Sequence, residues 1–291
     1  MILTSRRLFN LQPHIFAIMN EIVKKEVLAD KIKKIEVRVP EIASKALPGQ
    51  FVVLRINEEG ERIPLTVQKS DPGGGTITLI FLEIGKTTTL LGELNEGDRI
   101  LNVAGPLGVP SEIENYGTCV IVGGGIGSAC ALPVARALKE AGNYLISIIG
   151  AKTRDLLILE DEFDEISDEL HITTDDGSYG RKGFTVMVLQ DILDSGKGVD
   201  YVYSVGPVVM MRSVADITRK HSVKTVVSLN PIMVDATGMC GGCRVEVGGE
   251  TRFACVDGPE FDAHQVDFDL LLKRQRYYTE EEGCAMDRVG G

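Results

Sequence analysis

Short segments in which apolar and β-branched residues alternate with charged ones fill the chain from residue 20 to about residue 110. Four of these segments predict strands, at residues 22–27, 32–39, 50–56 and 76–82. Turn signals such as Pro48-Gly49 and Asp71-Pro-Gly-Gly-Gly75 separate them. Many short strands with regular turns are typical of a small antiparallel barrel or sandwich, here interrupted by one helix-like piece from Thr87 to Leu94.

The pattern changes near Gly117, where continuous apolar strands begin to alternate with longer helical stretches. The predicted strands are 119–122, 145–149, 171–174, 201–205 and 225–229, and the predicted helices are 128–141, 185–193 and 208–220. This alternation favours a doubly wound parallel sheet with helices on both faces. We expect this α/β domain to occupy residues 113–230.

The remaining chain is a small cysteine-rich module and a tail, residues 231–291. It contains a predicted hairpin that reverses at Gly248-Gly249 and a helix-like run from Val266 to Tyr278. The predicted architecture is therefore an α+β multidomain chain: an N-terminal extension (1–19), an antiparallel β-barrel (20–112), the α/β domain and the module.

Composition narrows the class of protein. A net charge of −11 argues against nucleic acid or an anionic membrane surface as a partner, and no apolar run is long enough to span a bilayer. Clustered rather than dispersed cysteines predict metal ligation in a reducing compartment, which we expect to be the cytoplasm. Residues 1–18 lack the features of a signal peptide, so Met19 is a candidate start and a flexible arm is the alternative.

The loop Gly123-Gly-Gly-Ile-Gly127 lies between a predicted strand and a predicted helix. In that position backbone N–H groups and the helix N-terminus can meet a pyrophosphate, although a tight turn without a ligand is the alternative. Ser128 replaces the last glycine of the dinucleotide fingerprint, and Gly150-Ala-Lys152 replaces its acidic residue. The loop therefore predicts a nucleotide site without distinguishing NADH from NADPH.

Two more loops follow predicted strands, Thr173 to Ser178 and Ser204 to Pro207. Ligands of open α/β sheets bind outside the carboxyl ends of the strands, so three such loops favour one nucleotide crevice. Asp175 and Asp176 are either turn residues or partners for ribose or carboxamide groups.

Two motifs in the predicted barrel suggest a flavin. In Arg62-Ile-Pro-Leu-Thr66 the arginine can pair with a phosphate and the threonine hydroxyl can reach a flavin nitrogen. Gly85-Lys-Thr-Thr-Thr-Leu90 opens the helix, so its amides and hydroxyls can cap a second phosphate. The alternatives are a solvated arginine and an ordinary helix cap.

The strongest motif is Cys240-x2-Cys243-x11-Cys255, which supplies three thiolates. Reading back by the x4 spacing of plant-type [2Fe–2S] loops reaches Asp235 as the fourth ligand. Cys284 is the competing ligand and a structural zinc ion is the competing metal. Cys119 and Cys130 are predicted to be small core residues, and His264 a surface residue.

With these domains in this order, residues 20–262 resemble the ferredoxin–NADP reductase superfamily. Within it the chain is similar to electron-transfer subunits of class B dihydroorotate dehydrogenase and to small subunits of NADH-dependent reduced ferredoxin:NADP oxidoreductase, also described as sulfide dehydrogenase. The segment Thr174 to Gly180 and the loop at 123–127 match closely. Asp235 stands where dihydroorotate dehydrogenase subunits have cysteine, which favours the ferredoxin:NADP oxidoreductase branch.

The resemblance implies FAD on the barrel, NAD(H) on the α/β domain and a [2Fe–2S] cluster on the module, with Thr66 as the catalytic residue near flavin N5. The expected metal ligands are Asp235, Cys240, Cys243 and Cys255. The expected cofactor-binding residues are Arg62, Pro64, Leu65, Thr66, Phe81, Gly85, Lys86, Thr87, Thr88, Gly123, Gly124, Gly125, Ile126, Gly127, Asp175, Asp176, Gly177, Gly206, Pro207 and Met210.

No acid–base pair stands out, so the terminal chemistry is expected on another subunit. The resemblance implies a heterodimer with a larger, NADPH-binding subunit that carries FAD and [4Fe–4S] clusters, performs flavin-based electron bifurcation and connects the chain indirectly to ferredoxin. Two alternatives stay within the class: an electron-transfer subunit of NAD-dependent dihydroorotate dehydrogenase, and a sulfide dehydrogenase subunit. A zinc-containing, nucleotide-binding redox sensor is the alternative from another class.

Overall fold

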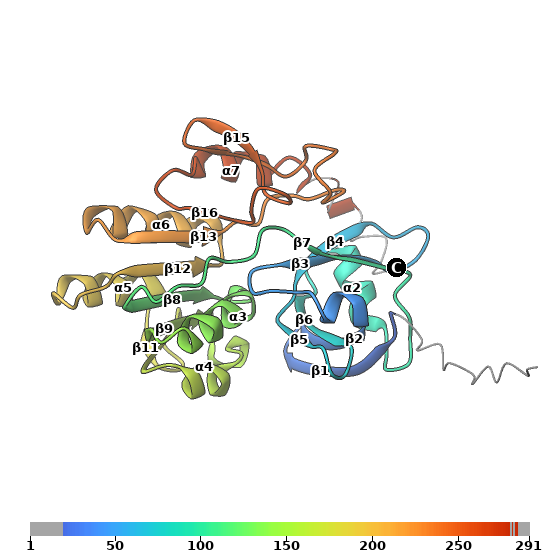
Figure 1. Cartoon of the computed structure of the whole chain (residues 1–291), viewed down its shortest axis with the longest axis horizontal. Helices are drawn as coiled ribbons and strands as arrows, with labels where there is room; N and C mark the ends of the chain where they lie inside the picture. Colours follow the sequence, from blue (N-terminus) through green and yellow to red (C-terminus); the bar gives the residue numbers. More distant parts are fainter. Residues whose placement is uncertain (1–19, 280, 282, 285–291) are drawn as a thin grey trace, which may run out of the picture.

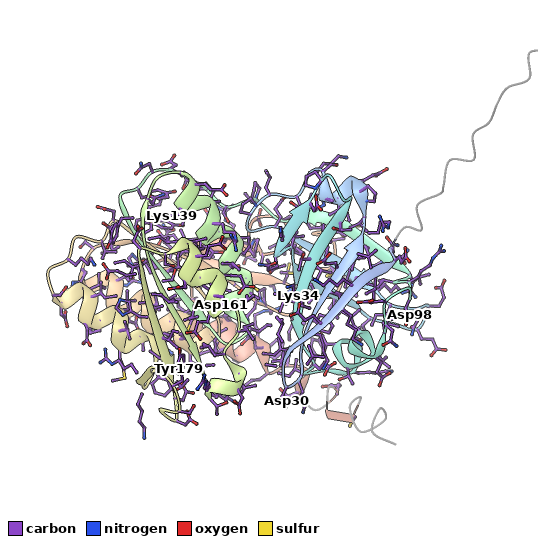
Figure 2. All side chains as sticks on the ribbon, turned by 90° about the horizontal axis from the view of Figure 1, so that it is seen from below. Asp30, Lys34, Asp98, Lys139, Asp161 and Tyr179 are labelled. Atoms are coloured by element: carbon purple, nitrogen blue, oxygen red, sulfur yellow. The ribbon has the colours of Figure 1, made fainter. Side chains whose placement is uncertain are left out.

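A computed structural model of the chain describes residues 20–279, 281, 283 and 284. The predicted N-terminal extension, residues 1–19, lies outside the described residues. Two larger units stand side by side, and a smaller unit lies across one side of both (Figure 1). Figure 2 shows the two larger units from below, with Lys34 on the first and Lys139 and Asp161 on helices of the second.

The first unit is built from two antiparallel sheets, as the alternating segments predict. One sheet has the order β1-β2-β6-β5 and the other the order β4-β3-β7. The strands are β1 (Ile22–Ala29), β2 (Ile32–Arg38), β3 (Phe51–Arg55), β4 (Arg62–Thr66), β5 (Lys69–Asp71), β6 (Thr76–Leu82) and β7 (Asn102–Leu107), with helices α1 (Pro40–Ala43) and α2 (Lys86–Glu93). Side chains that point inward from both sheets form one apolar core around Ile35, Leu54 and Leu79.

The second unit is a seven-stranded sheet in the order β11-β10-β9-β8-β12-β13-β16. Its strands are β8 (Thr118–Gly124), β9 (Tyr144–Ala151), β10 (Glu169–Thr174), β11 (Arg181–Lys182), β12 (Tyr201–Val205), β13 (Lys224–Ser228) and β16 (Glu260–Asp262). Its helices are α3 (Gly127–Glu140), α4 (Glu160–Ile166), α5 (Thr185–Asp194) and α6 (Val208–Lys220), with a 3-10 turn η1 (Arg154–Leu156). Separate apolar clusters cover its two faces, as a doubly wound sheet requires.

The third unit is a hairpin, β14 (Arg244–Val247) and β15 (Glu250–Phe253), followed by β16 and by α7 (Phe268–Gln275). The hairpin turns at Gly248 and Gly249, both with positive φ, as predicted. Strand β16 was not predicted. It pairs antiparallel with β13, so the module contributes the edge strand of the nucleotide sheet instead of forming a separate body.

The half-buried Glu260 ties these units together. The Oε1 atom of Glu260 on β16 accepts a 2.6 Å hydrogen bond from the Ser111 hydroxyl and a 2.7 Å bond from the Tyr203 hydroxyl. Ser111 lies in the connection after β7, and Tyr203 is fully buried on β12. Burial raises the pKa of Glu260, while the two hydrogen bonds act in the opposite direction. Within the described residues no helix is long and apolar enough to cross a membrane.

Candidate functional site

The three predicted nucleotide loops meet in one crevice at the carboxyl ends of the parallel strands. A cavity of about 470 Å³ is lined by Gly124, Gly125, Asp175, Pro207 and Met210, all expected to bind the nucleotide. Strands β8, β10 and β12 carry these loops, so sheet topology joins segments that are far apart in the sequence.

Two glycines explain why the first loop can approach a ligand. Gly125 has a φ of +56°, and a Cβ atom there would meet nothing within 4 Å, so the space above it is open. At Gly127 a Cβ atom would lie 2.3 Å from the backbone oxygen of Val205. A side chain at Gly127 would therefore push the start of α3 away from β12 and displace its N-terminus from the crevice.

The structure separates the two aspartates of the second loop, Thr173 to Ser178. Asp175 lines the crevice. Asp176 is exposed, and its Oδ1 atom accepts hydrogen bonds from the hydroxyl and the backbone amide of Ser178. The Ser178 hydroxyl bond and then the amide bond lower the pKa of Asp176. Asp176 therefore stabilises the turn, and Asp175 is the one placed to contact a ligand.

Sequence reasoning missed part of the lining of this crevice. Lys152 follows β9, Phe184 precedes α5, and Val209 and Ser213 lie on α6. Phe184 and Val209 are exposed large apolar side chains, at 60% and 59%. Single exposed apolar residues are ordinary on protein surfaces, and exposure cannot be read from a sequence, so no sequence signal marked these two residues.

The predicted flavin motif lies on one face of the β3–β4 pair. In the antiparallel register Phe51 stands opposite Thr66 and Val53 opposite Pro64. Directly opposed residues point to the same side of a sheet. Val52 and Leu54 fill the barrel core, so Phe51, Val53, Pro64 and Thr66 face outward, toward the other units.

Thr66 reaches the nucleotide unit through Cys130 on α3. Burial raises the pKa of the Cys130 thiol, and a hydrogen bond with the Thr66 side chain acts in the opposite direction. Cys130 packs at the edge of the core, as predicted, and it also contacts the residue expected to be catalytic. The predicted flavin contact and the helix that begins at the nucleotide loop are therefore neighbours.

Two residues expected to bind the flavin, Phe81 and Leu65, have their side chains in or against the barrel core. Phe81 is only 1% exposed and lies in the barrel core, so it can offer a cofactor only its backbone. Its strand was predicted correctly, but the strand is buried on both faces, which hides the period-two signal. Leu65 also packs against the barrel core and can offer a cofactor only its backbone.

The second flavin motif forms the start of α2. Thr88 accepts hydrogen bonds from the amides of Ile84 and Gly85 at 3.1 and 3.0 Å, so its hydroxyl caps its own helix. Thr87 is buried and donates to Glu61 at 3.3 Å, which brings this helix beside Arg62. Gly85 faces open space and Lys86 is exposed, so these two residues remain available to a phosphate.

The cysteine motif supplies metal donors in two pairs. The sulfur atoms of Cys243 and Cys255 are 3.1 Å apart and buried against Phe51 and Val53. Burial, and then the neighbouring Cys243 thiol, raise the pKa of Cys255. Two thiols this close in an apolar setting fit adjacent ligands of one iron, because metal binding removes their protons.

Cys240 and Asp235 form the second pair, on the exposed side of the same loop. The backbone amide of Gly242 donates to the Cys240 sulfur at 3.4 Å, and that amide, followed by the Asp235 amide, lowers the pKa of Cys240. Among the described residues no three Cys, His, Asp or Glu side chains surround a single point. Two pairs of donors agree with the two protein ligands per iron that a [2Fe–2S] cluster requires, so the chemistry of these residues fits such a cluster.

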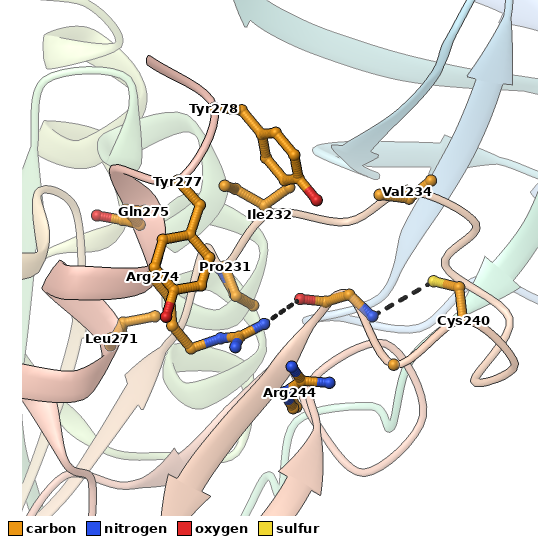
Figure 3. A pocket seen from close by; sticks show the side chains of 12 residues that line it. Pro231, Ile232, Val234, Cys240, Arg244, Leu271, Arg274, Gln275, Tyr277 and Tyr278 are labelled. Carbon is orange, nitrogen blue, oxygen red and sulfur yellow. Dashed lines mark hydrogen bonds between the residues drawn. The ribbon is translucent and has the colours of Figure 1, made fainter. Parts of the chain in front are cut away.

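Helix α7 reaches this loop. Arg274 donates a 3.1 Å hydrogen bond to the backbone oxygen of Gly242, the residue whose amide contacts Cys240 (Figure 3). Arg274, Arg244, Tyr277 and Tyr278 line a cavity of about 220 Å³ beside Cys240 (Figure 3). The predicted helical run after the motif therefore stabilises the cysteine loop, whereas Cys284 is exposed further along the tail.

His264 differs from its predicted surface position. It is half-buried, and its Nε2 atom lies 2.9 Å from the Thr218 hydroxyl on α6. Burial lowers its pKa, which suits a structural role between the module and the nucleotide unit.

A two-sheet barrel, a doubly wound nucleotide domain and a cysteine-rich module define the class of modular ferredoxin reductase-type electron-transfer proteins. Residues 230–267 match the iron-sulfur cluster binding domain of dihydroorotate dehydrogenase B. The chain is 50% identical over 270 residues to a dihydroorotate dehydrogenase B (NAD(+)) electron transfer subunit homolog of Thermotoga maritima, covering 93% of this chain and 95% of that protein. The chain therefore belongs to the family of dihydroorotate dehydrogenase B electron-transfer subunits.

Solved structures extend the comparison. A chain of an NADH-dependent reduced ferredoxin-NADP oxidoreductase, studied for flavin-based electron bifurcation, aligns with a TM-score of 0.88 and 50% identity over 94% of this chain and 98% of that one. Phthalate dioxygenase reductase shares the fold at a TM-score of 0.57 and 18% identity, over 78% of this chain and 85% of that one. The oxidoreductase class, the ferredoxin reductase-type fold and the iron–sulfur module predicted from the sequence are confirmed.

Proposed function

We propose that this chain is the NADH-, FAD- and [2Fe–2S]-binding subunit of an electron-bifurcating NADH-dependent ferredoxin:NADP oxidoreductase. The observation that carries the proposal is the β3–β4 register. Thr66 and Pro64 lie opposite Phe51 and Val53, and the latter two pack against Cys243 and Cys255. One pair of strands thus joins the flavin face to the cluster ligands.

In this proposal each unit has its own task. Residues 20–112 hold FAD, residues 113–230 hold NADH, and residues 231–291 hold the cluster. The first loop, Asp175 and Pro207 hold NADH, and Thr66 orients the flavin ring beside α3. When bound, FAD converts a two-electron hydride transfer into single-electron steps.

Apolar side chains exclude water from the space between the flavin face and the cluster ligands. Phe51 and Val53 are 4% and 5% exposed and fill the space between the strand pair and the thiols. Excluding water keeps the local dielectric low, which strengthens electrostatic effects on the redox centres. The amides around Cys240 favour its thiolate form, the form that ligates iron.

Two observations favour the bifurcating enzyme over a dihydroorotate dehydrogenase subunit. The NADH-dependent reduced ferredoxin-NADP oxidoreductase chain aligns with nearly the whole of this chain. Asp235 also lies near Cys240, and its carboxylate stands at the x4 spacing where dihydroorotate dehydrogenase subunits have cysteine. The partner is then a larger FAD- and [4Fe–4S]-containing subunit that binds NADPH, the pair forms a heterodimer in the cytoplasm, and ferredoxin exchanges electrons through the partner.

A dihydroorotate dehydrogenase role is the second candidate, because the family match carries that name. Anaerobic purification of the native complex tests both. We expect FAD and two irons on this chain, together with a flavoprotein partner that carries further iron in [4Fe–4S] clusters and reduces NADP⁺. A co-purifying partner that oxidises dihydroorotate would favour the second candidate, and a colourless protein containing zinc would exclude both.

A further inference from the structure

We propose that Arg62 is a positioning residue for Asp235, fixing the carboxylate ligand of the cluster and raising the cluster's affinity for an electron. The inference rests on the proposed function, because it requires a cluster at Asp235. It assigns to Arg62 a task in the iron–sulfur centre in place of the flavin-phosphate contact expected from its motif.

The geometry at Asp235 leaves little freedom to the carboxylate. The Nη1 atom of Arg62 lies 2.5 Å from Oδ1 of Asp235, and the Thr237 hydroxyl donates to the other oxygen, Oδ2. Each carboxylate oxygen has a second lone pair, so both bonds persist when an oxygen ligates iron. Holding both oxygens sets the rotation of the group and therefore the lone pairs offered to the metal.

The contact joins two units of the fold. Arg62 begins β4 of the barrel, and Asp235 lies 173 residues later in the cysteine loop. Among the residues that the structure describes, this is the only ion pair between residues 20–112 and the module. Arg62 is followed by Pro64 and Thr66 on the flavin face, so one short strand contacts both redox sites.

The positive charge of Arg62 determines the direction of its expected effect on the reduction potential of the cluster. Reduction adds one negative charge to the cluster, and a guanidinium bonded to its carboxylate ligand stabilises the reduced form. The Arg62 side chain is 52% exposed and that of Asp235 is 23% exposed, so solvent weakens the attraction without removing it. Loss of Arg62 should therefore lower the reduction potential and change the EPR spectrum of the reduced cluster.

The test compares Arg62→Gln and Arg62→Lys with Arg55→Gln in the full chain, purified without oxygen. Arg55 stands opposite Arg62 on β3 and bonds to the backbone of Glu58 and Gly60, which makes it a matched control. Iron, FAD, the EPR spectrum of the reduced cluster and its potential by EPR-monitored titration are measured. We expect Arg62→Gln to keep FAD and to show a lower potential with shifted g values, Arg62→Lys to restore part of both, and Arg55→Gln to match the parent.

If Arg62→Gln loses iron but keeps FAD, the inference is also supported, because the ligand is no longer held. A double-mutant cycle combines Arg62→Gln with Asp235→Cys. In the Asp235→Cys protein, Arg62→Gln should have little further effect on the reduction potential of the cluster. If Arg62→Gln leaves the potential and spectrum unchanged, or loses FAD with an unaltered cluster, the inference about Arg62 is wrong but the proposed function is unaffected. A parent protein without any cluster would overturn the proposed function as well.

Discussion

Phe51 stands directly opposite Thr66 in the β3–β4 ladder, and from one face of the sheet the two residues point toward different predicted redox sites. Phe51 packs in the apolar cluster that contains Cys243 and Cys255, whereas the Thr66 side chain lies close enough to Cys130, beside the nucleotide loop, to influence the pKa of its thiol. The three predicted sites therefore converge on a single pair of strands, and the following predictions probe that convergence from each side.

Gly127→Ala should weaken NADH binding. A methyl group there would lie 2.3 Å from the Val205 backbone oxygen, so the start of α3 has to move away from the crevice. We expect at least about a tenfold rise in the dissociation constant, equivalent to ~1.4 kcal/mol. Isothermal titration calorimetry of the flavin-loaded protein with NAD⁺, which makes the same nucleotide contacts but cannot reduce the flavin, measures it. The control is Gly198→Ala, where a Cβ atom meets nothing within 4 Å and binding should stay unchanged.

Glu260→Gln should change how stability depends on pH. Burial raises the folded-state pKa of Glu260 above its unfolded value, so its favourable contribution is complete below the unfolded pKa and is lost as pH rises through the folded pKa. Glutamine cannot ionise and keeps an acceptor for Ser111 and Tyr203. The melting temperature of the variant relative to the parent should therefore increase with pH above about 4.3. A difference that stays constant between acid and neutral pH would argue against a Glu260 whose pKa is raised in the folded protein.

Asp235→Cys should retain an assembled [2Fe–2S] cluster with a lower reduction potential, because thiolate is a softer and more strongly donating ligand than carboxylate. Cys284→Ser should leave both iron content and potential unchanged, since Cys284 is exposed in the tail. Iron analysis and EPR-monitored titration measure both variants. The opposite pattern, with cluster loss in Cys284→Ser and no shift in Asp235→Cys, would show that the ligand assignment is wrong.

Arg274→Ala should make the cluster less durable. Its hydrogen bond to Gly242 restrains the loop that holds Cys240, and losing a bond from a charged donor costs about 1.5–3 kcal/mol. The rate at which a chelator bleaches the cluster should rise several-fold. Lys273→Ala, an exposed neighbour on the same helix, is the control and should bleach at the parent rate.

Local sequence signals were enough to predict much of the fold. Helix α6 spans Val208–Lys220 as predicted, because apolar residues recur at helical spacing after Gly206-Pro207. The hairpin at Gly248-Gly249 and the three loops of the nucleotide crevice were predicted from glycine-containing turn sequences next to predicted strands. In each case the pattern lies within a few consecutive residues.

Features that depend on distant pairing were not predictable. Strand β16 has only three residues and is defined by its partner β13, not by its own composition. Phe81 lies in a strand with both faces buried, so the sequence could not show which way it points. The contact between Arg62 and Asp235 joins residues 173 positions apart, and each carries a plausible role of its own in the sequence.

Anaerobic titration of the purified chain with NADH, followed by absorbance and low-temperature EPR, tests the central claim most directly. If Phe51 and Val53 connect the flavin face to the cluster ligands, NADH alone should bleach the flavin and produce the EPR signal of a reduced [2Fe–2S] cluster in the same protein. A flavin that is fully reduced by NADH beside a cluster that stays oxidised would contradict the proposed route.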